Sequence, residues 1–208
     1  MKNIFRVAGT HHCESILHSA RNVMCTIPST ESFHALVRVC PHIHNLHIRT
    51  GSFITLAPGF ATLPLTRLHC HPIFFRRAVE NQGCAFALLT HLELFRPLNR
   101  EAWLILAQLP KLTHLAMRCN RDLGSYSQLL ATCISLRALV LLSHPTETEP
   151  GVLDLLLDDP RLVILFKMDD YAADWQHGAL TGHDYWERVD VFIKKRRSGE
   201  IHRGTLFL

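Results

Sequence analysis

The stretch Leu89-Thr90-His91-Leu92-Glu93-Leu94 shows the spacing that decides the fold, with apolar residues at its first, fourth and sixth positions. The same spacing begins at four other places, Ile43, Leu65, Leu112 and Leu136. An imperfect copy begins at Leu162 and has Lys167, not an apolar residue, at the sixth position. The middle apolar residues of these copies, in chain order, are Leu46, Leu68, Leu92, Leu115, Leu139 and Leu165. Successive copies are therefore 22, 24, 23, 24 and 26 residues apart.

We call this six-residue motif the phrase, and its recurrence predicts a repeat fold. A period in the twenties built on Leu-x-x-Leu-x-Leu is typical of a leucine-rich-repeat solenoid. Each phrase should form a short parallel strand whose side chains alternate between two faces. We therefore expect an α/β solenoid, a short irregular arc of parallel strands with convex helices, followed by a C-terminal capping segment. The arc should be irregular because only Asn120 fills the asparagine position that follows the strand in regular arrays.

Residues between the phrases should return the chain along the convex side. Periodic apolar residues predict helices at residues 31–39, 100–109, 125–134 and 151–158. Ser29 with Thr30, and Asn99, are suitable N-caps for the first two of these helices. Proline and glycine predict irregular loops at residues 56–63 and 74–84.

The repeat pattern fades before Ile43. Residues 1–30 are expected to hold an incomplete first repeat or an N-terminal remnant, with a helix and the start of a strand at residues 15–23 and a strand at residues 4–7. The repeats proper are expected to span residues 31–168.

The composition changes after the last repeat. Residues 169–208 contain two of the three tryptophans and two of the three tyrosines. We expect these residues to form an aromatic cap, because a solenoid needs one over its last repeat. Residues 184–197 have the spacing of an amphipathic helix. The aromatic residues expected to fill the cap are Tyr171, Trp175, Tyr185 and Trp186.

Composition limits the class of protein. The 208 residues carry a net charge of +4 with fifteen histidines neutral, which suits weak association with acidic partners and is no sign of specific nucleic-acid binding. The seven cysteines are odd in number and include no Cys-x-x-Cys pair, which indicates a reducing cytoplasmic or nuclear compartment. No apolar stretch is long enough to span a membrane. Arg6 interrupts the apolar run that a signal peptide would need.

From about residue 15 onward, and most closely from residue 90, the chain resembles the leucine-rich-repeat half of fungal F-box-type proteins. Cys40-Pro41-His42-Ile43-His44-Asn45-Leu46 matches their helix–Cys-Pro-x-Leu-x-x-Leu arrangement. The tail, with Tyr171-x-x-x-Trp175 and Tyr185-Trp186-x-Arg188, looks like the closing segment of an uncharacterised mushroom-lineage family.

The resemblance implies that the repeats recognise the substrate of a ubiquitin ligase, with an amino-terminal F-box docking the Skp-type adaptor. The first forty residues lack the Leu-Pro-x-Glu opening of an F-box. A Skp-type partner is therefore expected only if an F-box lies upstream. The alternative is a free-standing recognition module.

The residues between the apolar anchors should point to the concave side and form columns across the strands. Their spacing predicts a cationic, histidine-rich surface on the first four strands, suited to an acidic or polar protein partner; the alternative is a solvated sheet face that binds nothing. The histidines there should gain charge below about pH 6.5. The predicted partner-binding residues are Asn45, His47, Arg49, Arg67, His69, His71, His91, Glu93, His114 and Arg118.

Further along the arc the same columns become apolar. They should contain Ala138, Val140 and Leu142 from one phrase and Ile164, Phe166 and Met168 from the next. We expect the C-terminal cap to cover them, because large bare apolar patches are rare on soluble proteins.

Two clusters invite other functions. The cluster His42, His44, His47, His69, Cys70 and His71 suggests a metal site, but strand alternation lets no more than two or three of these ligands converge, and structural zinc needs four. Lys194-Lys195-Arg196-Arg197 could be an import signal or a nucleic-acid patch. The favoured interpretation is an ordinary helix C-terminus, with Gly199 placed for the stop.

Catalytic signatures are missing from the sequence. It contains no Gly-x-Ser-x-Gly, P-loop, Gly-x-Gly-x-x-Gly or His-Glu-x-x-His motif. We predict a non-catalytic protein–protein interaction module that uses no cofactor or metal and binds its partner on the concave repeat face.

Overall fold

The computed structural model describes residues 17–27, 29–50, 55–82, 86–98, 100–119, 124–143, 159–166 and 170–208. Within these residues the fold is α/β, with six α-helices and seven parallel strands that follow one another in one open sheet in chain order. The chain forms two compact units. Unit 1 comprises Met1–Phe95 and Leu109–Lys111, and unit 2 comprises Arg96–Gln108 and Leu112–Leu208. None of the described helices is long and apolar enough to cross a membrane.

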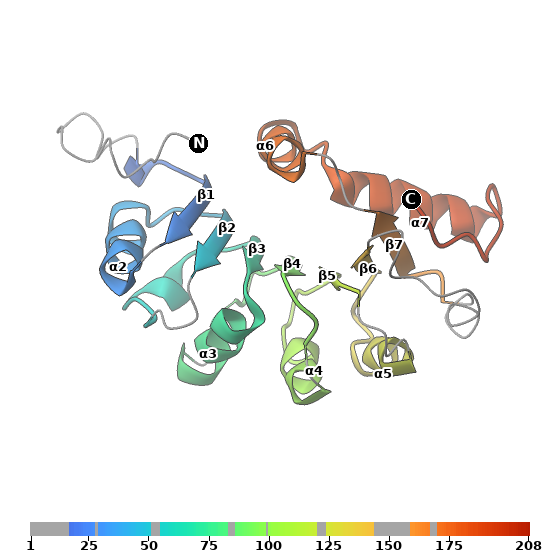
Figure 1. The fold of residues 1–208 in the computed structure, drawn as a ribbon, viewed down its shortest axis with the longest axis horizontal. Helices are drawn as coiled ribbons and strands as arrows, with labels where there is room; N and C mark the ends of the chain where they lie inside the picture. Colours follow the sequence, from blue (N-terminus) through green and yellow to red (C-terminus); the bar gives the residue numbers. More distant parts are fainter. Residues whose placement is uncertain are drawn as a thin grey trace. The chain divides into compact units, whose positions relative to one another are not determined.

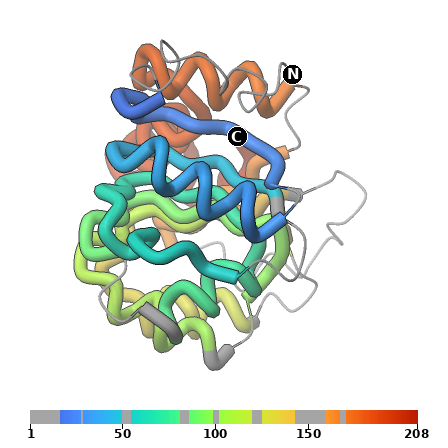
Figure 2. Tube along the Cα trace, turned by 90° about the vertical axis from the view of Figure 1, so that its left-hand side faces the viewer, coloured from blue at the N-terminus to red at the C-terminus, as the bar shows by residue number. Residues whose placement is uncertain are grey.

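Unit 1 alternates strands with returns. Its elements are β1 Asn22–Ile27, α2 Thr30–Val39, β2 Asn45–Thr50, a 3-10 turn η2 at Phe60–Thr62, β3 Arg67–Cys70, α3 Pro72–Gln82 and β4 His91–Leu94. Figure 2 shows these strand–helix turns stacked in chain order, and Figure 1 shows α2 and α3 on one face of the strands. The opposite sheet face of unit 1 therefore carries neither of its helices.

Unit 2 has helices on both faces of its strands. Its elements are α4 Arg100–Ala107, β5 His114–Arg118, α5 Gly124–Thr132, β6 Ala138–Ser143, β7 Leu162–Phe166, α6 Tyr171–Thr181 and α7 Tyr185–Ser198. In Figure 1, α5 lies below the strands and α7 crosses their other face.

The strand register confirms the repeat. In unit 1, Val23 pairs with Leu46, Leu46 with Leu68 and Leu68 with Leu92, so the partners are 23, 22 and 24 residues apart. In unit 2, Leu115 pairs with Leu139 and Leu139 with Leu162, at spacings of 24 and 23. All seven of these anchors are buried.

The prediction for the last repeat was wrong by three residues, because Leu162 and not Leu165 pairs with Leu139. An odd shift turns every side chain of a strand to the other face. Ile164 therefore lies with Leu141 on the sheet face away from α7. Val163 and Leu165 take the positions on the other face that were predicted for Ile164 and Phe166. The phrase was misread because Asp159 stands where a leucine should begin it; its carboxylate accepts hydrogen bonds from the Arg161 backbone N–H and guanidinium.

One strand was missed at the start of the chain. Residues 22–27 form β1, where only the beginning of a strand was expected at residue 23. Its residues Val23 and Cys25 pair with Leu46 and Ile48, so this strand is a further copy of the phrase written with smaller side chains. The strand predicted at residues 4–7 and the helix predicted at residues 151–158 lie outside the described residues.

Three of the predicted helices are confirmed as α2, α4 and α5, and Ser29 caps α2 by accepting a hydrogen bond from the Ser32 N–H at 3.2 Å. Asn99 is outside the described residues. The loop predicted at residues 74–84 is wrong, because α3 runs through Pro72–Gln82. Proline fits the first turn of a helix, and Phe74, Phe75 and Ala78 bury one face of α3. Residues 56–63 are irregular apart from η2.

A threonine ladder joins neighbouring repeats where the strands begin. The carbonyl of His44 accepts hydrogen bonds from the N–H groups of Thr66 and Arg67, and that of Thr66 accepts them from Thr90 and His91. The hydroxyls of Thr66 and Thr90 donate to the same two carbonyls, at 3.2 and 3.0 Å. Threonine here satisfies backbone carbonyls between repeats.

The predicted C-terminal amphipathic helix is confirmed as α7. Asp184 caps it by accepting hydrogen bonds from the N–H groups of Trp186 and Glu187, and Gly199 ends it with a φ of 80°. Tyr185 and Trp186 are buried, whereas Tyr171 and Trp175 are half-buried on α6, a helix that the sequence did not predict.

The last residues of the chain extend the sheet beyond β7. The N–H of Ile164 donates to the carbonyl of Leu206 at 2.7 Å, and the N–H of Leu208 donates to the carbonyl of Ile164 at 3.1 Å. The rings of Phe207 and Phe166 stack with their centroids 5.0 Å apart. The tail thus pairs with an edge of β7 that would otherwise expose its backbone groups.

The described cysteines are all free thiols. Cys40 and Cys133 are buried at matching places before two phrases, as small apolar residues. Burial raises the pKa of Cys133 to about 11 and, with Cys40 nearby, that of Cys25 to about 12. These thiols are therefore protonated and weak nucleophiles near neutral pH.

Candidate functional site

The sheet face of unit 1 opposite α2 and α3 has three buried polar residues at its centre. His47, His69 and Glu93 are register partners on β2, β3 and β4. They are only 4%, 6% and 5% exposed. Strand alternation correctly places the three side chains on one face, but they are buried there and not exposed to solvent.

Ring contacts account for part of this burial. The ring centroids of His47 and His69 are 4.0 Å apart, and the ring of Phe95 lies 4.0 Å from that of His69. The Arg49 guanidinium lies over the ring of Phe95, 5.9 Å from its centroid. The side chains therefore lean across the face and cover one another.

This environment fixes the charge of His47. Burial lowers its pKa to about 3, and the neighbouring His69 and Arg49 act in the same direction against Glu93. The predicted gain of charge below about pH 6.5 is therefore wrong for His47. It remains a neutral ring throughout the physiological range.

His69 and Glu93 form a buried imidazole–carboxylate pair, with Nδ1 and Oε1 3.3 Å apart. Such a pair can orient a ring or hold a proton, but a reaction also needs a nucleophile or a bound group. The adjacent Cys70 lies on the opposite, helix side and is fully buried, which raises the pKa of its thiol. Within the described ranges, no three His, Cys, Asp or Glu side chains are placed to hold a metal ion.

More accessible polar residues surround the buried centre. Asn45, Arg67 and His91 are half-buried register partners at the start of the strands. Toward the other end of the strands, the exposed Arg49 lies in β2 and the half-buried His71 directly follows β3. The amide of Asn45 donates to Asn22 Oδ1 at 2.6 Å and accepts from the Thr66 hydroxyl at 3.2 Å. We call this set the polar face: a buried floor of His47, His69 and Glu93, and a rim of Asn45, Arg49, Arg67, His71 and His91.

Two predicted partner-binding residues belong to unit 2. Arg118 is exposed at the end of β5. His114 is buried, and its ring is held at both nitrogens, by Thr113 Oγ1 at 2.8 Å from Nδ1 and by Asp190 Oδ1 at 2.9 Å from Nε2. The ring of His114 is thus engaged by Thr113 and by Asp190 of α7, and its predicted role in partner binding stays a prediction.

The Thr113–His114–Asp190 set contains a hydroxyl, an imidazole and a carboxylate, the groups of a hydrolytic triad. The same hydroxyl–imidazole hydrogen bond recurs at Thr90 and His91, also at 2.8 Å. Because the Thr-His pair repeats with the phrase, we interpret it as part of the repeat structure.

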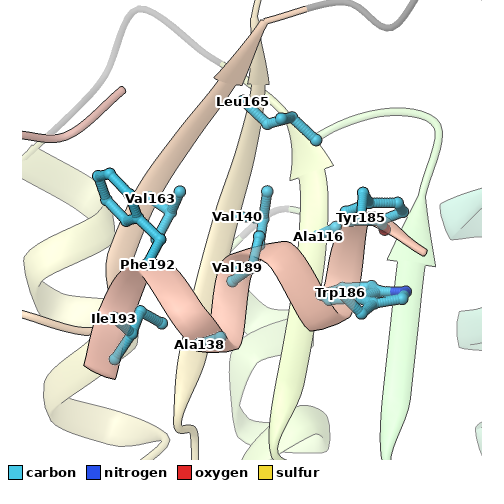
Figure 3. Packing of buried hydrophobic residues seen from close by; sticks show 10 residues of the cluster. All are labelled: Ala116, Ala138, Val140, Val163, Leu165, Tyr185, Trp186, Val189, Phe192 and Ile193. Atoms are coloured by element: carbon cyan, nitrogen blue, oxygen red, sulfur yellow. The ribbon is translucent and has the colours of Figure 1, made fainter. Parts of the chain in front are cut away.

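The apolar part of the sheet face is covered by α7, as the sequence predicted for the later columns. Ala116, Ala138 and Val140 pack with Val163 and Leu165 against α7. Figure 3 shows α7 crossing the strands, with Tyr185 and Trp186 near Ala116, Val189 near Val140 and Phe192 near Val163. This face of unit 2 is therefore part of the core.

The basic run at the end of α7 is not one exposed patch. Arg196 is 1% exposed, and its guanidinium donates to the carbonyls of Leu162 and Arg203. Lys194, Lys195 and Arg197 remain exposed. Together with the stop at Gly199, this supports the interpretation as a helix C-terminus.

Comparisons with known proteins add no relative. No family model, curated protein or solved structure matches the chain. The function is therefore inferred from the two sheet faces alone.

Proposed function

We propose that the chain is a non-catalytic protein-interaction module of the leucine-rich-repeat type, which binds an acidic segment of a partner protein on the polar face. Strands in chain order, a spacing of 22 to 24 residues and buried anchors support the repeat class. The position of α7 and the pairing of the tail with β7 support a capping role for the C-terminal segment.

One contrast carries the proposal. In unit 2 the sheet face opposite α5 is apolar and is filled by α7. In unit 1 the corresponding face is polar, and α2 and α3 both lie on the other side. Polar side chains at these positions do little for a core, so their role is better explained by a ligand.

The charges on the polar face favour an acidic partner. Arg49 and Arg67 are permanently charged, and the carboxylate of the face, Glu93, is buried beside His69. Guanidinium groups form paired hydrogen bonds with carboxylates. A floor of rings in mutual contact beneath an arginine-containing rim has the composition of protein interfaces, which are enriched in arginine and aromatic residues.

The proposal can be tested with an oligoglutamate peptide as the probe. Arg49→Glu combined with Arg67→Glu should weaken its binding by roughly ten-fold or more at low salt. The matched control is Arg38→Glu combined with Arg76→Glu, which makes the same charge change on exposed residues of α2 and α3 on the other side of the sheet and should bind nearly as tightly as wild type. Equal weakening in the control would mean that net charge alone attracts the peptide, and would contradict a site on the polar face.

A further inference from the structure

Unit 2 contains a pocket of about 190 Å³. Among the residues that the structure describes, it is lined by Pro160, Arg196, Arg197 and Arg203. Three of these four residues are arginines, from the last turn of α7 and from the tail that follows it. None of them belongs to the polar face. The pocket is therefore a second candidate site, and the charged side chains of its described lining are all arginines.

The buried Arg196 builds this pocket. Its Nη1 donates to the carbonyl of Leu162 at 2.6 Å, and its Nε and Nη2 donate to the carbonyl of Arg203 at 3.0 and 2.6 Å. A turn closed by the hydrogen bond from Thr205 N–H to the His202 carbonyl holds the tail on either side of Arg203. The tail is thus fixed against both α7 and the start of β7.

Among the described residues, no carboxylate pairs with Arg197 or Arg203 of the pocket. The carboxylate of Asp159 interacts electrostatically with Arg196, but it already forms a bidentate ion pair with the Arg161 guanidinium at 2.7 to 3.2 Å. The side chains of Arg197 and Arg203 make no hydrogen bond or ion pair with any described residue. Like charges held together raise the free energy of the folded state, and an anion between them would lower it.

The C-terminal dipole of α7 opposes an anion at this place. Its effect is reduced because the last carbonyls already accept hydrogen bonds. The Arg196 carbonyl accepts one from the Gly199 N–H, and the Lys195 carbonyl accepts them from the N–H groups of Glu200 and Ile201. The opposing effect of the helix end is therefore weakened at the pocket.

We propose that this pocket binds a phosphate group. A phosphate monoester carries close to two negative charges and several acceptor oxygens, which match the fixed forks of arginine side chains better than a single carboxylate does. The volume is below the range of roughly 300–1,000 Å³ typical of sites for whole small molecules. It suits a single phosphate group, either free or on a phosphorylated side chain of another protein.

The test is calorimetric titration of the whole chain at constant ionic strength, with chloride replaced by the probe. The probes are inorganic phosphate, a phosphoserine peptide and the same peptide without its phosphate. The variant is Arg197→Glu with Arg203→Glu, two exposed residues whose change should leave the fold intact. The matched control is Lys194→Glu with Lys195→Glu, which makes the same charge change on exposed residues of α7 outside the pocket.

Saturable binding of a phosphate-bearing probe, weakened by roughly ten-fold or more in the arginine variant and retained in the lysine control, supports the proposal. Binding of inorganic phosphate alone identifies the free ion as the ligand, and preference for the phosphoserine peptide identifies a modified protein. Equal loss in both variants, equal binding of the unphosphorylated peptide, or no saturation with any probe would overturn it. Circular dichroism melting of each variant checks that unfolding is not the cause.

Discussion

Nε2 of His114 on β5 lies 2.9 Å from Oδ1 of Asp190 on α7, and this contact joins two elements separated by 76 residues. The imidazole side chain is 8% exposed and the carboxylate 56%. Asp190→Ala removes the carboxylate that bonds Nε2 of this buried ring, so we expect the free energy of unfolding to fall by about 1 kcal/mol. Urea denaturation near neutral pH measures this change.

The control for this prediction is Glu187→Ala on the same helix. Glu187 pairs with His183 at 2.6 Å, but these side chains are 46% and 66% exposed. An exposed pair of this kind contributes only a few tenths of a kcal/mol. Equal effects of the two substitutions would contradict a specific role for the Asp190 contact.

His47 should make the protein sensitive to acid. Its folded pKa of about 3 lies below the unfolded value of about 6.5, because burial disfavours the charged ring. The unfolded chain therefore binds a proton that the folded chain does not, so stability present above about pH 6.5 is progressively lost as the pH falls toward 3. At about pH 4.5 the loss should be on the order of 2 kcal/mol.

Replacement by a group that does not titrate tests this prediction. His47→Gln should lose less stability than wild type between about pH 7 and pH 4.5 in paired urea denaturation experiments. His44→Gln serves as the control, because His44 is a less buried histidine just before β2. If His47→Gln and wild type lose the same amount, His47 is not the group that titrates.

Much of the fold could be predicted because most repeats have leucine at the anchor positions. Leucine at matching positions locates β3 to β6, but β1 uses valine and cysteine, and the phrase of β7 begins with aspartate. The last repeat was therefore aligned on Leu165, and the odd shift reversed its faces. The corrected spacing of 23 residues is closer to the other repeats than the predicted 26, so regularity of the period was the better guide.

The site was harder to predict because its properties depend on neighbours that are distant in sequence. Alternation correctly places His47, His69 and Glu93 on one face, but not the ring of Phe95 against them or their burial. It places His114 on the same kind of face, but no pattern links His114 to Asp190. The arginine pocket was obscured in the same way, because the run of basic residues does not reveal that Arg196 points inward.

The packing of α7 on the sheet predicts a sharp difference between two valines of that helix. Val189 is fully buried against Val140 and its neighbours, whereas Val191, two positions later, is 48% exposed. Val189→Asp should lower the free energy of unfolding by about 3 kcal/mol or more, since it buries a carboxylate without a partner. Val191→Asp should cost less than about 1 kcal/mol. Similar losses at the two positions, measured by guanidinium denaturation, would contradict the packing of α7 in Figure 3.

Arg196 should hold the tail in place. Arg196→Ala leaves the carbonyls of Leu162 and Arg203 without this donor, so we expect a loss of about 2–4 kcal/mol in the free energy of unfolding. Amide hydrogen exchange should also accelerate at Ile164 and Leu208, whose N–H groups bond across the junction of β7 and the tail. Arg197→Ala, next to it but exposed, should change neither quantity appreciably. Unchanged exchange at Ile164 in Arg196→Ala would show that the tail pairs with β7 without help from the buried guanidinium.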